Sequence, residues 1–284
     1  TLRKRPEHRY RSMDELRDIA TDRTDAPARR GSRLAYALRA LGRSEPPRRL
    51  VVGGRVFDRM KVIKHDFFAA TAFYRDVASA DQAVLKIGRT EPFFGFPLEW
   101  IGRFLLDREL HVYRRLRDLP NIPAVVATLG RTGFLHDFIP GAPLSRHRPV
   151  PDGFFDELQS LMRTLHERGI AYVDTNKPQN ILHGTDGRPY LIDFQISFDL
   201  HRAVAVWPIT WIFRILARGD DYHILKHKKR FRPDQLTDAE RARLEHKSWP
   251  IRLHRFLTRP YFIVRRAIMG RLKRSGHVLP EGTK

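Results

Sequence analysis

Ile170-Ala-Tyr-Val-Asp-Thr-Asn-Lys-Pro-Gln-Asn-Ile-Leu-His-Gly-Thr-Asp-Gly-Arg-Pro-Tyr-Leu-Ile-Asp-Phe-Gln195 is the stretch that decides the fold. It opens with a polar loop and continues with two short apolar runs, residues 181–183 and 190–192, which are predicted strands. Thr185-Asp186-Gly187 lies between them, and an Asp-Gly pair favours a tight turn between antiparallel strands. We therefore expect a small antiparallel sheet with a polar loop at its entrance.

Polar side chains stand at the ends of these two predicted strands. Asp174, Lys177 and Asn180 precede the first strand, and Asp193 follows the second. Two carboxylates and an amide that converge there would offer the hard oxygen ligands that Mg²⁺ takes together with substrate phosphates. Each residue alone is more simply explained as a turn cap or a strand end, so the prediction of a metal site depends on the whole set.

The order of these residues resembles the catalytic core of the protein-kinase-like superfamily. In that family a loop of the form H-R-D-x-K-x-x-N supplies a base and one metal ligand, and a D-F-G triplet supplies the other ligand. Tyr172-Val173-Asp174 stands for the first triplet, residues 177–180 for the K-x-x-N portion, and Asp193-Phe194-Gln195 for D-F-G. The loop is one residue longer than in ordinary protein kinases, and Gln195 replaces the final glycine. The pattern is closer to the atypical bacterial branch that includes lipopolysaccharide-core, sugar and small-molecule kinases.

The composition sets outer limits on the function. The chain has 284 residues, of which 42% are hydrophobic and 30% charged, as in a globular protein. The absence of cysteine excludes disulfides, thiol catalysis and cysteine-based metal sites. The longest uncharged apolar run, about residues 203–213, is too short to span a bilayer. The net charge of +21 would attract phosphates, nucleic acid or an anionic membrane, although a solvated arginine-rich surface gives the same charge.

A sheet is predicted in the first half of the chain, with strands at 50–52, 60–63, 69–74, 82–87, 124–129 and 133–139. In the fourth strand, Ala83-Val84-Leu85-Lys86 resembles the V-A-I-K strand of kinases, and strand alternation places Val84 and Lys86 on one face. A helix predicted at about residues 98–116 carries Glu109 in an apolar stripe, where an unpaired carboxylate would be costly. A Lys86–Glu109 pair would reproduce the kinase clamp on the nucleotide phosphates. The alternative is a solvated Glu109 at the edge of the stripe.

Two further segments bear on nucleotide binding. Kinases join their first two strands with a glycine-rich loop, but the corresponding junction, residues 65–70, contains no glycine. Residues 136–139 precede Pro140-Gly141 and resemble the hinge of small-molecule kinases. Their backbone groups would contact adenine, whereas the side chains of His136 and Asp137 are expected at the surface. An amphipathic helix is predicted from about residue 154 to about Gly169.

The chain is expected to divide into four parts. Residues 1–48 form a basic N-terminal extension that packs loosely, 49–139 the N-lobe, 140–245 the C-lobe with the catalytic loop, and 246–284 a basic aromatic C-terminal extension.

Three segments of the second half have no assigned chemistry. Pro208 is expected to break the apolar segment 204–216, and the charged segment 220–230 could meet an anionic substrate. Residues 247–274 interleave basic and aromatic side chains. A membrane interface with anionic lipid, a docking helix and, less favoured, nucleic acid remain alternatives for that segment.

The resemblance implies an α+β, two-lobed protein-kinase-like fold with an antiparallel-sheet N-lobe and a mainly helical, shortened C-lobe. It implies ATP and Mg²⁺ as cofactors, with Asn180 and Asp193 as metal ligands. Asp174 would orient the attacking hydroxyl or accept its proton, and Lys177 would stabilise the transferring phosphoryl group. The residues that the resemblance implies for nucleotide binding are Val84, Lys86, Glu109, His136, Phe138 and Leu182.

Three functions remain open from the sequence. The favoured one is an ATP-dependent kinase that transfers the γ-phosphoryl group to a hydroxyl of a sugar, a glycolipid such as lipopolysaccharide core, or another small molecule. The others are a protein serine/threonine kinase and a nucleotide-binding pseudokinase, which the glycine-free junction and Gln195 would favour. The expected location is the cytoplasm, at the inner face of the membrane if the C-terminal extension binds lipid. The sequence specifies neither the acceptor nor the oligomeric state.

Overall fold

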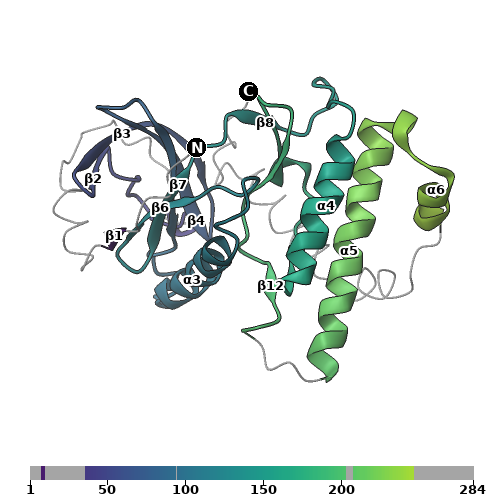
Figure 1. The fold of residues 1–284 in the computed structure, drawn as a ribbon. Helices are drawn as coiled ribbons and strands as arrows, with labels where there is room; N and C mark the ends of the chain where they lie inside the picture. Colours follow the sequence, from purple (N-terminus) through teal and green to yellow (C-terminus); the bar gives the residue numbers. More distant parts are fainter. Residues whose placement is uncertain (1–7, 10–35, 94, 203–206, 246–284) are drawn as a thin grey trace, which may run out of the picture. The chain divides into compact units, whose positions relative to one another are not determined.

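The computed structural model describes residues 8–9, 36–93, 95–202 and 207–245 (Figure 1). The chain forms two compact units, each described below by itself. The described part of the N-terminal unit lies within residues 1–110 and 124–138, and that of the C-terminal unit within residues 111–123 and 139–245.

The N-terminal unit is built on a seven-stranded sheet in the order β1-β6-β7-β5-β4-β3-β2. All neighbouring strands are antiparallel except β1 and β6, which are parallel. The bounds are β1 His8–Arg9, β2 Arg49–Val52, β3 Arg55–His65, β4 Ala69–Asp76, β5 Gln82–Gly88, β6 Val125–Leu129 and β7 Gly133–Asp137. The six predicted strands are therefore confirmed. β3 is longer than predicted, and irregularities in its pairing with β4 between Arg59 and Lys61 and between Val62 and Lys64 hid its alternation.

One face of this sheet forms a hydrophobic core, because alternate residues of each strand point to the same side. The buried residues of this core are Leu50, Val52, Phe57, Ala72, Tyr74, Ala83, Leu85, Ala127, Leu129 and Leu135. Helix α3 (Glu99–Arg115) follows β5, close to the predicted bounds of 98–116. The boundary between the two units falls inside this helix, after Leu110.

Residues 36–48 belong to the packing of the N-terminal unit. Ala40 is fully buried, and its carbonyl oxygen accepts hydrogen bonds from the backbone N–H groups of Thr90 and Glu91. Arg89 is also fully buried and donates to the carbonyl oxygens of Ala37 and Phe67. The expectation of loose packing is wrong for this part of the extension. Apart from residues 8 and 9, the part of this extension before residue 36 lies outside the described residues.

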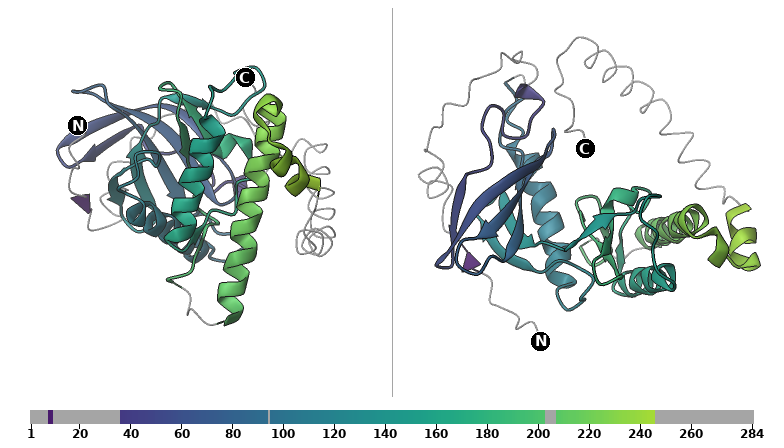
Figure 2. Two further views of the ribbon diagram at one scale, coloured as in Figure 1. Left: turned by 45° about the vertical axis from the view of Figure 1, so that its right-hand side comes forward. Right: turned by 90° about the horizontal axis from the view of Figure 1, so that it is seen from above.

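The C-terminal unit combines small sheets with helices. β8 (Gly141–Pro143), β10 (Ile181–Gly184) and β11 (Pro189–Leu191) form an antiparallel sheet in the order β11-β10-β8, which confirms the predicted hairpin. β9 (Ile170–Ala171) pairs with β12 (Phe198–Asp199). The helices are α4 (Phe154–Glu167), α5 (Trp207–Phe231) and α6 (Asp238–Glu245), and α4 lies beside α5 (Figures 1 and 2). An antiparallel-sheet unit and a mainly helical unit together confirm the α+β fold class.

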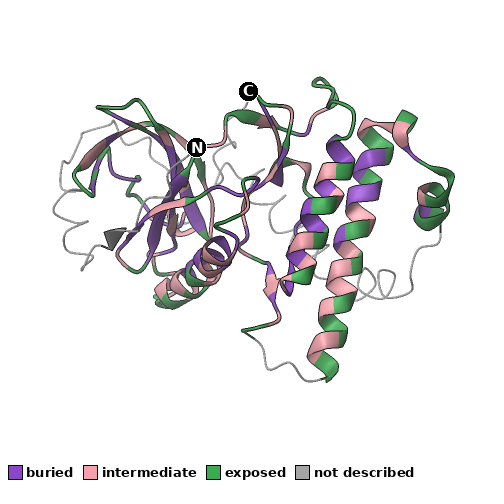
Figure 3. Ribbon diagram, in the orientation of Figure 1, coloured by how far each residue is buried: buried purple, intermediate pink, exposed green. Residues whose placement is uncertain are grey.

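Helix α5 differs most from its prediction. Pro208 does not break the segment, because it lies in the first turn of the helix, where a proline's missing N–H has no intrahelical partner to lose. No residue from 207 to 219 is buried, whereas Asp220, His227 and Lys228 are buried in the second half of the helix. Figure 3 shows this contrast along the helix. The charged segment 220–230 is thus only partly a surface segment, contrary to the expectation that it could meet a substrate as a whole.

The three tryptophans in the described ranges are all exposed to solvent. Trp207 is 80% exposed and Trp211 48% at the start of α5, and Trp100 is 65% exposed on α3. The remaining tryptophan, Trp249, lies outside the described residues, as does the whole basic aromatic extension 246–284.

Candidate active site

The polar loop between β9 and β10 holds Asp174 in a network of short contacts. The carboxylate is 5% exposed, and its Oδ2 accepts hydrogen bonds from Lys177 Nζ at 2.6 Å and Asn180 Nδ2 at 2.8 Å. Asn180 closes the one-turn 3₁₀ helix Pro178–Asn180, and its backbone carbonyl accepts from Ile192 N–H. The loop and β11 are therefore tied together, and the structure brings the three predicted residues of the loop into one cluster.

Asp193 follows β11 in a left-handed backbone conformation, with φ of 64°. Aspartate and asparagine adopt this conformation more readily than other non-glycine residues. The backbone N–H of Asp193 donates to the hydroxyl of Tyr113 at 3.2 Å. The next residue, Phe194, is fully buried and packs edge-on against Tyr113 and Tyr172, with ring centroids 5.1 Å away in both cases. The triplet is thereby anchored by its central aromatic residue.

Negative charge is concentrated around this loop even though the chain has a net charge of +21. Tyr172 is buried, and burial raises its pKa well above the usual range, an effect that the carboxylates of Asp193, Asp174 and Asp220 reinforce. The pKa of Asp174 is also raised, first by burial and further by Asp193, while the Lys177 ammonium opposes the shift. The two carboxylates predicted for phosphotransfer chemistry therefore interact electrostatically.

Asp220 is a site residue that the sequence did not reveal. It is 1% exposed, and its carboxylate accepts hydrogen bonds from the backbone N–H groups of Tyr172 and Val173, both at 2.8 Å. The Thr175 hydroxyl also donates to it, and His166 Nε2 lies 3.3 Å from its Oδ2. One carboxylate on α5 thus contacts residues on both sides of Asp174. Two of its four partners are backbone groups, which leave no side-chain pattern in the sequence.

Val173 shows why such an anchor is needed. Its φ is 69°, a strained conformation for a β-branched residue. Such a conformation persists only where surrounding contacts impose it, and the Val173 N–H bond to Asp220 is one of those contacts. A second contact comes from His227, whose Nε2 lies 2.8 Å from the carbonyl oxygen of Thr175.

The N-terminal unit contains the predicted lysine–glutamate pair. Lys86 Nζ lies 2.8 Å from Glu109 Oε1 and 2.7 Å from Oε2, and the two residues are 7% and 1% exposed. A buried carboxylate needs such a partner to offset its desolvation. The structure therefore favours the paired arrangement over a solvated Glu109, while the role of the pair in nucleotide binding stays a prediction.

Two glycines allow α3 to approach β5 closely enough for this pair. A Cβ atom on Gly102 would lie 2.2 Å from the carbonyl oxygen of Arg89, and a Cβ atom on Gly88 would lie 2.7 Å from the carbonyl oxygen of Gly102. Neither space accommodates a methyl group. The helix and the strand end therefore meet backbone to backbone, about two helical turns before Glu109.

Three of the remaining residues predicted for nucleotide binding lie in strands β5, β7 and β10, and the fourth, Phe138, directly follows β7. Val84 is directly opposite His136 in the β5–β7 ladder, and both are nearly buried, so the prediction of a surface side chain is wrong for His136. The backbone N–H of Phe138 donates to the Gln82 carbonyl, and its ring packs against Phe73 at 4.9 Å. Leu182 lies in β10, in the C-terminal unit.

The turn between β3 and β4 confirms that no glycine-rich loop is present there. Asp66 Oδ1 accepts hydrogen bonds from the backbone N–H groups of Phe68 at 2.9 Å and Ala69 at 2.8 Å. Two amides that could face a phosphate in a kinase glycine-rich loop are thus already satisfied within the turn.

The donor set of the loop fits Mg²⁺ in the way that nucleotide-dependent enzymes hold it. The Asn180 side-chain amide donates through Nδ2 to Asp174, which leaves its oxygen as a potential ligand, and the Asp193 carboxylate is close enough to interact with Asp174. Mg²⁺ commonly takes one or two protein ligands and completes its shell with water and phosphate oxygens. Among the described residues, no group of three or more histidine, cysteine or acidic side chains is placed to hold a metal by itself.

Comparisons with known proteins complete this description. No family model and no curated protein matches the sequence. The structure is similar to the Rio2 kinase–ADP/Mg²⁺–phosphoaspartate complex from Chaetomium thermophilum, with a TM-score of 0.49 and 16% identity, over 63% of this chain and 57% of that one. It is also similar to the BubR1 kinase domain, with a TM-score of 0.41 and 18% identity, over 54% of this chain and 50% of that one. The chain therefore spans little more than half the length of these kinases. In the described part of the chain, no helix is long and apolar enough to cross a membrane.

Proposed function

We propose that the protein is an ATP-dependent phosphotransferase that acts on a hydroxyl group of a sugar, a glycolipid or another small molecule. The observation that carries this proposal is the loop cluster, in which Lys177 and Asn180 hold a buried Asp174 carboxylate beside Asp193. A nucleotide-binding scaffold has no need for a carboxylate fixed in this way. The Lys86–Glu109 pair supplies the cation that such an enzyme uses to orient nucleotide phosphates.

In this proposal Asp174 receives the acceptor hydroxyl. Its carboxylate orients the hydroxyl oxygen toward the γ-phosphorus and accepts the proton as the new O–P bond forms and the bond to the leaving ADP oxygen breaks. Lys177, already 2.6 Å from Asp174, is placed to neutralise negative charge on the transferring group. Mg²⁺, held by Asn180 and Asp193 when nucleotide is bound, would neutralise phosphate charge.

The first test is Mg²⁺-dependent ATP turnover by the full chain, with and without a glycolipid extract. Asp174→Asn and Asp193→Asn are expected to lower turnover by about 100-fold or more, since each removes a group used in the reaction. Asp118→Asn, an exposed aspartate of the same unit that pairs with Arg168, is the matched control and is expected to retain activity. Equal turnover in the wild type and both site variants would refute the proposal.

A pseudokinase is the second candidate, and the β3–β4 turn favours it. The backbone amides of Phe68 and Ala69 are already bonded to Asp66, so two donors of the usual phosphate cradle are taken up within the turn. Nucleotide binding without turnover, in the presence of every acceptor extract, would support this alternative. A protein serine/threonine kinase would instead transfer phosphate to a generic protein substrate. Membrane attachment through residues 247–274 stays a prediction, because this segment lies outside the described residues.

A further inference from the structure

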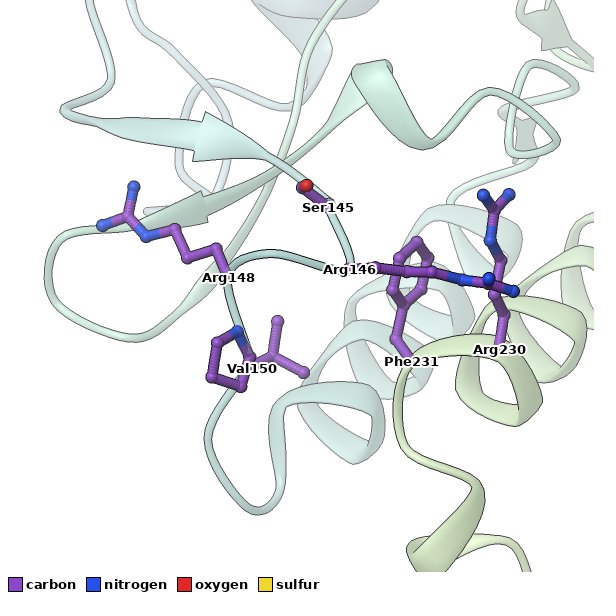
Figure 4. A pocket seen from close by; sticks show the side chains of 7 residues that line it. Ser145, Arg146, Arg148, Val150, Arg230 and Phe231 are labelled. Carbon is purple, nitrogen blue, oxygen red and sulfur yellow. The ribbon is translucent and has the colours of Figure 1, made fainter.

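A second polar site lies in the C-terminal unit, outside the loop cluster. It is a cavity of about 130 Å³ between the loop that follows β8 and the C-terminal end of α5 (Figure 4). Its lining residues are Ser145, Arg146, Arg148, Pro149, Val150, Arg230 and Phe231. In Figure 4 the Arg146 side chain points toward the side of the cavity that carries Arg230, whereas Arg148 lies on the opposite side. The Arg230 guanidinium carbon lies 5.3 Å from the centre of the Phe231 ring.

The arginines around this cavity pair with no carboxylate in the part of the chain that the structure describes. Among the described residues, no carboxylate lies within ion-pair distance of Arg146, Arg148 or Arg230. The charge of Arg148 extends to His183 on β10, whose pKa is lowered by burial first and by this arginine second. Like charges gathered around one cavity repel one another unless an anion lies between them.

Carboxylates are present near this cavity, because two neighbouring cationic residues are paired with them. Two positions away from Arg230 along α5, Lys228 pairs with Asp156 and Glu240. Arg232, directly after the helix, pairs with Asp152 and Asp234 and also donates to the Val150 carbonyl at 2.9 Å. These pairs fix the walls of the cavity and use the nearby carboxylates. The arginines that line it are left for a ligand.

Both walls of the cavity are connected to the catalytic loop. Leu144, next to Ser145, donates its backbone N–H to the carbonyl oxygen of Ile181, the residue that follows Asn180. On the other wall, one turn before Arg230, His227 contacts the Thr175 carbonyl, next to Asp174. A ligand bound in the cavity would therefore contact segments that are hydrogen-bonded to the residues on both sides of the Asp174 loop.

We propose that this cavity binds a phosphate group carried by the acceptor, with Arg146, Arg148 and Arg230 as its cationic ligands. The inference rests on the proposed phosphotransferase function and narrows its substrate to an acceptor that is already phosphorylated. Guanidinium groups suit a phosphate because their planar array of N–H donors matches its oxygens.

The test measures anion binding separately from turnover. Inorganic phosphate and glucose 6-phosphate are titrated into the full chain by calorimetry, using the wild type, Arg146→Glu, Arg230→Glu and the double variant. Each single variant is expected to weaken binding about tenfold or more, because it removes a charge-assisted contact and adds repulsion. Arg146 and Arg230 are exposed, so neither change should prevent folding. Unchanged binding in the double variant would overturn the proposal.

Two controls separate this site from general charge effects and from the nucleotide site. Arg163→Glu makes the same change in net charge at an exposed position of α4 and is expected to leave binding unaffected. Lys86→Met removes the clamp lysine and should abolish turnover while phosphate binding persists. Loss of binding in Lys86→Met but not in Arg230→Glu would place the phosphate at the nucleotide site and refute the inference.

The source of the phosphate is distinguished with vesicles and kinetics. Wild-type binding to vesicles of phosphatidylcholine with phosphatidic acid, lost in Arg230→Glu, would indicate a lipid phosphate, whereas binding only to glucose 6-phosphate indicates a soluble one. In an active preparation, Arg230→Glu should raise the KM for the phosphorylated acceptor about tenfold and leave the KM for ATP unchanged. Phosphate binding that needs the arginines, in a protein without any ATP turnover, would refute the role of the cavity in acceptor binding. ATP turnover together with phosphate binding that does not depend on the arginines would refute the cavity as the phosphate site and leave the proposed function standing.

Discussion

At the scale of single residues, the ionisation of Asp174 is set by opposing neighbours. Burial and Asp193 raise its pKa above the usual value of 3.8, whereas Lys177 and Asn180 lower it. A proposed base must be ionised to accept a proton, so its rate contribution is lost as the pH falls through this raised pKa. The balance makes Lys177 a determinant of the working pH range.

Replacing Lys177 by methionine is expected to raise the pKa of Asp174 further, because it removes the main group that lowers it. The acid limb of the kcat/KM profile should then move to higher pH. The rate at neutral pH should also fall by about tenfold or more, since Lys177 is proposed to act on the phosphoryl group. Lys61→Met, at an exposed position of the sheet, serves as the control. An acid limb that stays in place in Lys177→Met would contradict this assignment.

Asp220 should act as a positioning residue rather than a catalytic one. Asp220→Asn keeps the shape of the side chain but presents an amide to donors from Tyr172, Val173 and Thr175. We expect a loss of about 2–3 kcal/mol in the free energy of unfolding, measured by thermal unfolding with far-UV circular dichroism. We also expect a lower kcat with an unchanged KM for ATP, because the loop moves while the nucleotide contacts in the other unit remain.

Thr175→Val separates the two effects of Asp220, since it removes only the hydroxyl contact to the carboxylate. It should cost less stability than Asp220→Asn and lower kcat less. A loss of stability in Asp220→Asn with full kcat would show that the carboxylate supports the fold and not the loop geometry.

The Lys86–Glu109 pair could be predicted because both residues lie on regular secondary-structure elements. Strand alternation places Lys86 on one face of its strand, and helix periodicity places Glu109 on one face of its helix. Asp220 could not be assigned, since it binds backbone groups in a loop more than 40 residues earlier in the chain. The burial of His136 was missed for the related reason that a hinge resemblance describes backbone and not side-chain packing.

At the scale of secondary-structure elements, the contact between α3 and β5 depends on the absence of side chains at Gly102 and Gly88. Gly102→Ala would place its Cβ 2.2 Å from the Arg89 carbonyl oxygen and must displace the helix. We expect a loss of about 2–3 kcal/mol in the free energy of unfolding, as for overpacking in a core. Because α3 carries Glu109, the affinity for nucleotide should fall as well, which equilibrium binding of a fluorescent ATP analogue would measure.

Gly219→Ala provides the matched control on another helix. A Cβ atom at Gly219 meets no other atom within 4 Å, so the change should raise the free energy of unfolding by about 0.5–1 kcal/mol through helix propensity. Equal effects of the two alanine substitutions would show that close packing at Gly102 does not limit the position of α3.

Sequence signals at the starts of helices differ in how directly they can be interpreted. The Thr237-Asp-Ala-Glu240 pattern at the start of α6 forms a capping box, with both reciprocal hydrogen bonds present at 2.9 and 3.2 Å. Pro208 was interpreted as a breaker because a proline inside an apolar run usually is one. Its place in the first turn could not be known without the start of the helix. Helix propensity alone shows that a proline is tolerated in the first turn of a helix, but it does not show where the helix starts.

At the scale of the whole molecule, positive charge is general but its arrangement is specific. The net charge of +21 was compatible with several partners, and it did not locate a site. The structure separates two environments within the C-terminal unit. One gathers carboxylates around Tyr172, and the other gathers arginines around the cavity beside α5, where no carboxylate of the described residues pairs with them. Composition could not predict this separation, because it depends on which acids pair with Lys228 and Arg232.

The exposure of Trp100, Trp207 and Trp211 determines which spectroscopic signal can follow unfolding. Indole rings in contact with water already emit at long wavelength, so the emission of these three rings is expected to shift little in denaturant. Tyr74, Tyr113 and Tyr172 are instead buried and held in asymmetric surroundings, and their near-UV circular dichroism should disappear on unfolding. A large red shift of the tryptophan emission would mean that these rings are covered in solution. If the shift is small, a thermal scan that follows tryptophan emission alone would miss a cooperative unfolding transition.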